Sequence, residues 1–253
     1  MKLFDLTNKV ALVTGASSGL GVQFAEALAE AGADVAIVAR RMDRLEALAE
    51  KINATGRRCK AYACDVTKEE DICSVVKKIK EDFGKIDILV NNAGVVIPGE
   101  CAEYSLENWN KVMAVNITGV FLFSREVSKV MLKNNYGKIV NIASVAGLLG
   151  SSSGVSYSAS KAAVINFTRA LAVELATKGI TVNAIAPGVF ASEMTEGFFG
   201  GKVDDSAAGR TPMGRIGRPG ELNGALIYLA SDASSYTTGQ VIAVDGGWTA
   251  SLD

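Results

Sequence analysis

The chain has 253 residues, 49% of them hydrophobic, and its 26 Lys and Arg side chains nearly balance 27 Asp and Glu, for a formal net charge of −1. This length suits one α/β domain, the composition argues against intrinsic disorder, and the lack of a basic excess disfavours nucleic acid as a partner. The sequence contains no histidine, which excludes Ser-His-Asp and Cys-His nucleophile chemistry and disfavours a bound metal such as catalytic zinc.

The four cysteines form no Cys-x-x-Cys pair and no disulfide framework: Cys59, Cys64, Cys73 and Cys101. We therefore expect reduced thiols and a reducing compartment. The N-terminus lacks the apolar stretch of a signal peptide, and no run of about 18 apolar residues indicates a membrane span. The sequence thus predicts a cytoplasmic protein with no membrane partner.

Short β-branched runs alternate with longer helical patterns along almost the whole chain. The predicted strands are 10–14, 34–38, 86–90, 138–142, 181–185 and 240–244, with a weaker seventh at 59–63. The predicted helices are 21–31, 44–54, 68–83, 106–132, 155–178 and 219–230. This alternation predicts a single doubly wound, Rossmann-like α/β domain over residues 1–253, with a seven-stranded parallel sheet and helices on both faces.

The first strand runs directly into a glycine-rich turn, residues 14–21, and then into a helical pattern. Glycine permits the tight turn, and the missing side chains let the backbone approach a pyrophosphate at the positive end of a helix. The turn lacks the strict Gly-x-Gly-x-x-Gly spacing, and an ordinary βα turn is the alternative explanation. We expect a dinucleotide site that includes Gly15, Ser17, Ser18, Gly19 and Leu20.

The end of the second strand indicates which dinucleotide is bound. NAD sites of this fold place an acidic residue there for the ribose 2′-hydroxyl, whereas NADP sites offer Arg to a 2′-phosphate. Here Ala39 is followed by Arg40 and Arg41. The sequence therefore predicts NADP(H), with Arg40 as the direct phosphate ligand and Arg41 stacking on adenine. A solvated basic start of the next helix is the alternative.

Tyr157 and Lys161 stand four residues apart at the start of a long helical pattern, so they share one helix face. A phenol with an ordinary pKa near 10 is a poor acid or base at neutral pH. A neighbouring ammonium favours the phenolate, so we expect Lys161 to bring the pKa of Tyr157 toward the working range.

Residues 191–218 are rich in glycine and lack regular periodicity. Long loops in compact domains are usually functional. The glycines provide backbone freedom, and Met194, Phe198, Phe199 and Met213 provide apolar surface. We expect a substrate-loop insertion that is mobile without ligand, orders with NADP and substrate, and sets chain-length preference through Phe198 and Phe199.

Taken together, these motifs resemble the short-chain dehydrogenase/reductase family over the whole chain. The matching positions are the glycine turn at 14–21, Asp65 and Val66 after the third strand, Asn91 to Gly94 after the fourth, Asn116, Ser144, Tyr157, Lys161, Pro187 and Gly188. Each lies at a strand's carboxyl end or on a neighbouring helix, where an open α/β sheet binds its ligand.

The resemblance implies a catalytic tetrad. Tyr157 would exchange a proton with the carbonyl oxygen, and Ser144 would donate a hydrogen bond to that oxygen. Lys161 would hold the nicotinamide ribose and favour tyrosinate. Asn116 would bend its helix and seat a water that links Lys161 to solvent.

The resemblance also implies the remaining contacts to the dinucleotide. Asp65 and Val66 would meet adenine, and Asn92, Ala93 and Gly94 would line the adenosine ribose. The backbone at Pro187, Gly188 and Val189 would meet the carboxamide, and Ser192 stands where the family usually has Thr. Asn91 has a simpler explanation, which is to tie neighbouring strands together.

The sequence is compatible with several classes of small ketone or alcohol substrate. A general NADPH-dependent carbonyl reductase needs only the tetrad. A 3-oxoacyl-acyl-carrier-protein reductase should also offer basic residues to its acidic carrier, for which Lys129 and Lys133 are available, but Val173 stands where such reductases often have Arg. A gluconate 5-dehydrogenase-like polyol dehydrogenase fits the double-Arg strand end and the 186–194 loop about equally well. A non-catalytic NADP-binding regulator is the remote alternative.

The predicted helices at 106–132 and 155–178 carry more apolar and small positions than one buried face requires. By resemblance we expect a homotetramer with two-fold interfaces, to one of which residues 241–248 contribute.

Overall fold

The computed structural model describes residues 2–209 and 211–252, so Arg210 of the predicted substrate loop lies outside the described residues. Within those ranges, seven parallel strands form one sheet in the order β3-β2-β1-β4-β5-β6-β7. Their bounds are β1 (Val10–Thr14), β2 (Asp34–Ala39), β3 (Cys59–Ala63), β4 (Ile88–Asn91), β5 (Gly137–Ile142), β6 (Ile180–Pro187) and β7 (Val241–Val244). The predicted Rossmann-like fold with its seven-stranded sheet is confirmed.

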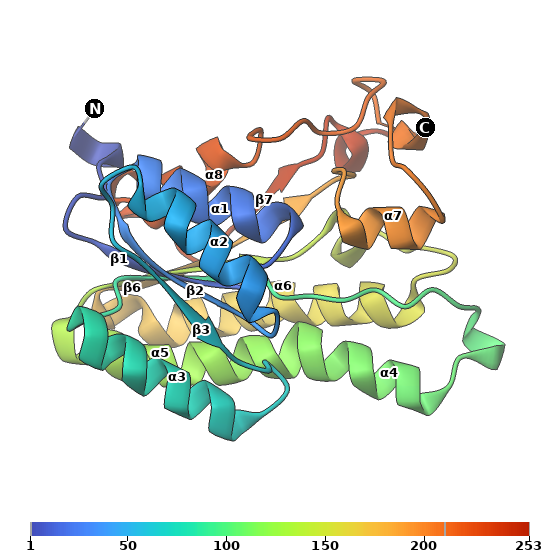
Figure 1. The fold of residues 1–253 in the computed structure, drawn as a ribbon. Helices are drawn as coiled ribbons and strands as arrows, with labels where there is room; N and C mark the ends of the chain where they lie inside the picture. Colours follow the sequence, from blue (N-terminus) through green and yellow to red (C-terminus); the bar gives the residue numbers. More distant parts are fainter. Residues whose placement is uncertain (1, 210, 253) are drawn as a thin grey trace.

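Helices cover both faces of the sheet (Figure 1). On one face lie α1 (Gly19–Glu30), α2 (Met42–Asn53) and α8 (Asn223–Ala230), and on the other lie α3 (Glu69–Phe83), α4 (Leu106–Met113), α5 (Gly119–Asn134) and α6 (Val155–Leu175). The short helix α7 (Glu193–Phe199) stands apart from both layers. None of the helices in the described ranges combines the length and apolar character needed to cross a lipid bilayer.

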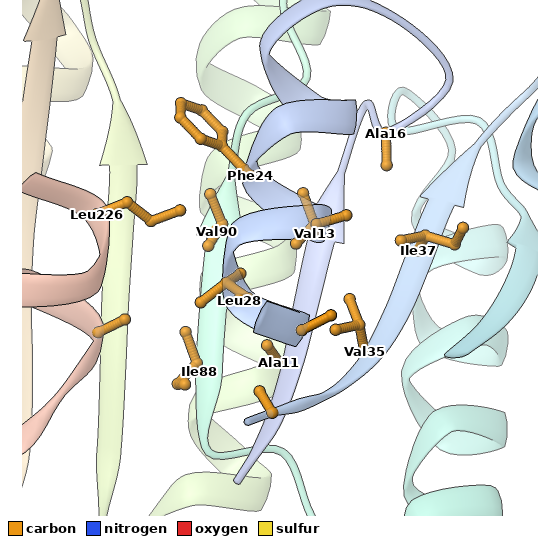
Figure 2. Packing of buried hydrophobic residues seen from close by; sticks show 14 of the residues in the cluster. Ala11, Val13, Ala16, Phe24, Leu28, Val35, Ile37, Ile88, Val90 and Leu226 are labelled. Atoms are coloured by element: carbon orange, nitrogen blue, oxygen red, sulfur yellow. The ribbon is translucent and has the colours of Figure 1, made fainter. Parts of the chain in front are cut away.

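Buried strands place successive side chains on opposite faces, and this alternation builds two cores. In β1, Ala11 and Val13 pack toward α1 and α8, whereas Leu12 packs toward the opposite helices. Figure 2 shows Phe24 and Leu28 of α1 lying over these strands. The two apolar layers hold the carboxyl ends of the strands in a fixed arrangement.

The strand order reverses at β1, which pairs with β2 on one side and with β4 on the other. The chains leaving β1 and β4 therefore diverge at one edge of the sheet, which is where open α/β sheets form a ligand crevice.

The predicted helix at 106–132 is interrupted, because a π-helical segment (Ala114–Thr118) separates α4 from α5. The predicted helix at 219–230 begins only at Asn223, since residues 219–222 form a turn in which Gly220 adopts a left-handed φ of 88°. The predicted irregular loop contains α7 and a 3₁₀ turn (Asp205–Ala208), and a bridge between Phe190 and Gly217 closes its base.

A buried polar chain crosses the sheet beneath the crevice. The Asn91 amide donates to Asn141 Oδ1 at 2.8 Å and to Ser124 Oγ at 3.0 Å, and the Asn141 amide donates to Thr168 Oγ1 at 2.9 Å. These bonds satisfy polar groups that would otherwise be costly to bury. Asn91 thus ties β4 to β5 and α5.

We predict that Phe24→Ala lowers the free energy of unfolding by about 3–5 kcal/mol, because it leaves a cavity between α1 and the sheet. The ring of Phe24 is fully buried, whereas that of Tyr236 is fully exposed. Urea denaturation of both variants measures the difference, and Tyr236→Ala should stay within about 0.5 kcal/mol of wild type. Equal losses in the two variants would contradict the described packing.

Candidate active site

A cleft of about 640 Å³ opens at the carboxyl ends of the strands. Every residue predicted for catalysis or dinucleotide binding lines it except Asn116 and Val189. The lining residues that the sequence predicted are Gly15, Ser17, Ser18, Gly19, Leu20, Arg40, Arg41, Asp65, Val66, Asn92, Ala93, Gly94, Ser144, Tyr157, Lys161, Pro187, Gly188 and Ser192. The fold therefore brings together residues that follow six of the strands with Tyr157 and Lys161 of α6.

The glycine turn has no room for a side chain at Gly15 or Gly21. Gly15 has φ of 68°, and a Cβ there would lie 2.8 Å from the Cα of Ala93. A Cβ on Gly21 would lie 2.3 Å from the Gly15 carbonyl oxygen. The missing side chain at Gly15 lets the turn lie against the loop after β4, and Gly19 and Leu20 at the N-terminus of α1 line the cleft.

The loop after β4 braces this turn. The Asn92 amide donates to the carbonyls of Thr14 at 2.9 Å and Gly15 at 3.2 Å. The Thr14 hydroxyl in turn accepts the backbone N–H groups of Asn92 and Ala93. The side chain of Asn92 therefore positions the glycine turn, and Asn92 also lines the cleft.

Arg41 contacts both the glycine turn and α7. Its guanidinium donates to Ser17 Oγ at 3.2 Å and to Ser18 Oγ at 2.8 Å, and it forms an ion pair with Glu193 at 3.1 Å. It lies across the glycine turn, where it can meet an anion together with two hydroxyl groups. Arg40 is exposed at the same rim.

The carboxylate of Asp65 is oriented by its own loop. Its Oδ1 accepts the backbone N–H of Thr67 at 3.0 Å and the Thr67 hydroxyl at 2.8 Å. The hydrogen bond from the Thr67 backbone, helped by the charge of Arg40, holds the pKa of Asp65 below its usual value. The side chain therefore stays an acceptor at neutral pH.

Ser144, Tyr157 and Lys161 meet at the centre of the cleft. Ser144 follows β5, and its Oγ accepts the backbone N–H of Ala146 at 3.1 Å. Tyr157 and Lys161 share one face of α6, with the Lys161 Nζ 5.6 Å from the centroid of the phenol ring. That Nζ donates to the Ile142 carbonyl of β5 at 2.7 Å.

Burial shifts the pKa values of Lys161 and Tyr157. It lowers the pKa of Lys161 to about 8. It also raises the pKa of Tyr157, and the hydrogen bond with Ser144 only partly opposes this. The expectation that the pKa of Tyr157 is brought down is therefore wrong, because desolvation of the phenolate outweighs the hydrogen bond with Ser144.

Asn116 lies fully buried in the π-helical segment that joins α4 and α5. Its side chain accepts from the Val95 N–H at 2.8 Å and donates to the Val95 carbonyl at 2.9 Å. It also donates to Ser160 Oγ at 3.0 Å, and Ser160 donates to the Tyr157 carbonyl at 2.7 Å. Asn116 thus connects the loop after β4 to the helix that carries Tyr157.

Two positioning residues escaped the sequence analysis. Ser160 stands inside the Tyr157–Lys161 motif, so that position was the available signal. Tyr104 had none, since its partners are distant in sequence: its hydroxyl donates to the Ile97 carbonyl at 2.8 Å and bonds Ser156 Oγ at 2.7 Å. Tyr104 thereby joins the loop after β4 to the start of α6.

Val189 faces a neighbouring cavity of about 460 Å³ instead of the main cleft. Its carbonyl accepts the N–H of Gly217 at 2.8 Å, which closes the base of the 191–218 segment. Ser192 caps α7 and forms a reciprocal capping box with Thr195.

Among the described residues, no group of three or more His, Cys, Asp or Glu side chains is placed to hold a metal.

Comparison with known proteins gives close matches over nearly the full chain. A family model described as "Enoyl-(Acyl carrier protein) reductase" matches residues 15–249. The chain is 41% identical to the 2-dehydro-3-deoxy-D-gluconate 5-dehydrogenase of Pseudoalteromonas atlantica, over 98% of each chain. It is 42% identical to the 3-oxoacyl-(acyl-carrier-protein) reductase of Synechocystis sp., over 96% of this chain and 97% of that protein.

The same agreement holds for three-dimensional structure. The gluconate 5-dehydrogenase from Burkholderia cenocepacia J2315, solved in complex with NADP and tartrate, matches with a TM-score of 0.95 and 35% identity over 99% of both chains. Such likeness shows a common family as well as a common fold.

The lowered pKa of Lys161 has a consequence for stability. Between about pH 8 and pH 10.5 the unfolded chain holds this proton and the folded chain does not. The contribution of Lys161 to the free energy of unfolding therefore rises with pH in this window, by up to about 1.4 kcal/mol per pH unit.

We predict that Lys161→Met removes this contribution. In the absence of dinucleotide, the difference in unfolding free energy between wild type and Lys161→Met should shift in favour of wild type from pH 8 to pH 10. Urea titrations at several pH values measure it. A difference that stays constant over this range would show that the buried amine titrates normally.

Proposed function

The chain belongs to the short-chain dehydrogenase/reductase family, and we propose that it is an NADP(H)-dependent carbonyl reductase that interconverts ketones and secondary alcohols. The observation that carries the proposal is the meeting of Ser144, Tyr157 and Lys161 in the cleft that the glycine turn also lines. An acid, a hydrogen-bond donor and a dinucleotide cradle in one cleft are what hydride transfer to a carbonyl requires.

The residues present fit a dinucleotide. The close packing at Gly15 and Gly21 leaves backbone exposed at the N-terminus of α1, where a pyrophosphate is favoured. The arginines after β2 suit a 2′-phosphate, and the neighbouring carboxylate of Asp65 can accept from an adenine amino group. When bound, the nicotinamide supplies or accepts the hydride.

The tetrad performs the rest of the reaction. In reduction, Tyr157 donates its phenolic proton to the carbonyl oxygen, and the Ser144 hydroxyl donates a hydrogen bond to the same oxygen. The raised pKa of Tyr157 means that the phenol is protonated at neutral pH, which is the form that donates a proton in reduction. Lys161 binds ribose hydroxyls, and its ammonium stabilises the phenolate that forms after proton transfer.

Two narrower substrate assignments follow the names of the relatives, one for a 3-oxoacyl carrier-protein thioester and one for a sugar acid. Two observations disfavour docking of an acidic carrier protein. The charge of Lys129 is already paired with Glu126 at 2.7 Å, and the apolar side chain of Val173 is 81% exposed and offers no positive charge. We therefore place the general carbonyl reductase first. An intact tetrad argues against a non-catalytic regulator.

We further propose that the 191–218 segment is the substrate lid. Phe198 and Phe199 stack edge to face on α7 at 5.2 Å, and Met194 of the same helix lines the cleft. Movement of α7 would thus carry apolar surface toward or away from the bound ketone. Comparing kcat/KM for 3-oxoacyl thioesters, simple ketones, keto esters and 5-ketogluconate distinguishes these substrate assignments.

We propose a cytoplasmic homotetramer. Unpaired thiols at all four cysteines are consistent with a reducing compartment. Exposed apolar side chains on α5 and α6, including Phe121, Leu132 and Val173, give surface for packing against a second copy.

The test of the chemistry is Tyr157→Phe, which removes the proton donor and keeps the ring. We predict that kcat falls by a factor of about 10²–10⁴, while the Kd for NADPH changes little. Steady-state kinetics and NADPH fluorescence titration give the two values. Near-wild-type turnover would contradict the mechanism.

A second prediction concerns the choice of dinucleotide. Replacing Ala39 by Asp together with Arg40→Ala should shift the kcat/KM ratio from NADPH toward NADH, because the new carboxylate repels a 2′-phosphate and the cation is lost. Lys51→Ala, which removes a charge at the far end of α2, is the matched control. A wild-type enzyme that prefers NADH would refute the assignment.

A further inference from the structure

An ion-pair cluster spans the mouth of the dinucleotide cleft. Glu193, the first residue of α7, pairs through Oε2 with Arg41 at 3.1 Å and through Oε1 with Arg44 of α2. Residues about 150 positions apart in sequence are thus joined across the opening. The guanidiniums hold the pKa of Glu193 below its usual value, so the carboxylate is charged.

This carboxylate uses one donor, Arg41, that the proposed function assigns to another anion. Arg41 also donates to the hydroxyls of Ser17 and Ser18, so one guanidinium connects the glycine turn to α7. Carboxylate and phosphate groups engage guanidinium forks in the same bidentate manner. A 2′-phosphate that binds beside Arg40 and Arg41 must therefore compete with Glu193.

Glu193 is anchored at the start of α7, so its two ion pairs fasten that end of the helix to Arg41 and to Arg44. It follows Ser192, whose capping box with Thr195 fixes the first turn, and the Thr195 hydroxyl donates to the Phe190 carbonyl at 2.8 Å. A Cβ on Gly19 would lie 3.3 Å from the Cβ of Ser192, so this turn touches the glycine loop. Release of the carboxylate would remove both tethers from the first residue of α7, the helix that also places Met194 at the cleft.

We propose that Glu193 is an exchangeable counter-ion for the 2′-phosphate of the dinucleotide. In the free protein it neutralises Arg41 and Arg44 and fastens α7 across the cleft. The 2′-phosphate displaces it and releases the helix, whereas a dinucleotide without that phosphate leaves the pairs intact. Glu193 therefore sets cofactor specificity and makes lid movement depend on the phosphorylated form. This inference rests on the proposed use of NADP(H).

The exchange is energetically accessible. All three side chains are about half exposed, and ion pairs in that setting are weak enough for a ligand to replace them. Removing the competing carboxylate should therefore strengthen binding of a 2′-phosphate by about threefold to tenfold. It should not change binding of the same nucleotide without that phosphate.

Calorimetric titration with 2′,5′-ADP and with 5′-ADP tests this without any turnover. We expect Glu193→Gln to bind 2′,5′-ADP about threefold to tenfold more tightly than wild type, with 5′-ADP affinity unchanged within about twofold. Glu196→Gln, one turn further along α7, removes the same charge from an exposed position outside the cluster and should match wild type.

Hydrogen exchange of the α7 amides provides the second measurement. In wild type, 2′,5′-ADP should speed exchange in residues 193–199, and 5′-ADP should not. In Glu193→Gln, exchange should be fast before any ligand is added.

Equal or weaker binding of 2′,5′-ADP by Glu193→Gln would overturn the counter-ion role, since Glu193 would then orient the arginines for the phosphate. Slower α7 exchange in wild type on adding 2′,5′-ADP would overturn the release step. Wild-type protein that fails to distinguish the two nucleotides would instead refute the proposed use of NADP(H), and with it this inference.

Discussion

The buried ammonium of Lys161 is the constraint on which the site depends. An amine this far from water needs a partner, and it finds one in the Ile142 carbonyl at the end of β5. That bond fixes α6 against the sheet, so Tyr157, one turn earlier, has a defined place beside Ser144. Asn116 and Ser160 hold the other side of the same helix turn and connect it to the loop after β4.

Burial has opposite effects on the two titrating groups of this site. It lowers the pKa of the lysine and raises that of the tyrosine, so both groups are driven toward their neutral forms. A neutral phenol is a loaded proton donor, which connects the packing of α6 to reduction of a carbonyl. The dinucleotide cleft adds the other half of the chemistry, and the ion pairs of Glu193 link α2 and the glycine turn to α7.

Much of this architecture is predictable from the sequence because its determinants are local. Buried parallel strands produce apolar runs such as 10–14 and 34–38, and the glycine turn and the Tyr157–Lys161 motif each lie within one short segment. Contacts between distant segments carry no such signal, so Tyr104 and Glu193 were missed, and α7 was expected to be irregular. The direction of the Tyr157 pKa was mispredicted, since helix spacing shows a neighbouring charge but not the loss of solvent.

The measurement that tests this account most directly is the pKa of the Tyr157 phenol in the dinucleotide-free protein. Ultraviolet difference titration of wild type against Tyr157→Phe isolates this one tyrosine. The account predicts a pKa above the ordinary value of 10.0, because burial outweighs the hydrogen bond from Ser144. A phenol that ionises near pH 7 would contradict it and would make a preformed tyrosinate the resting state.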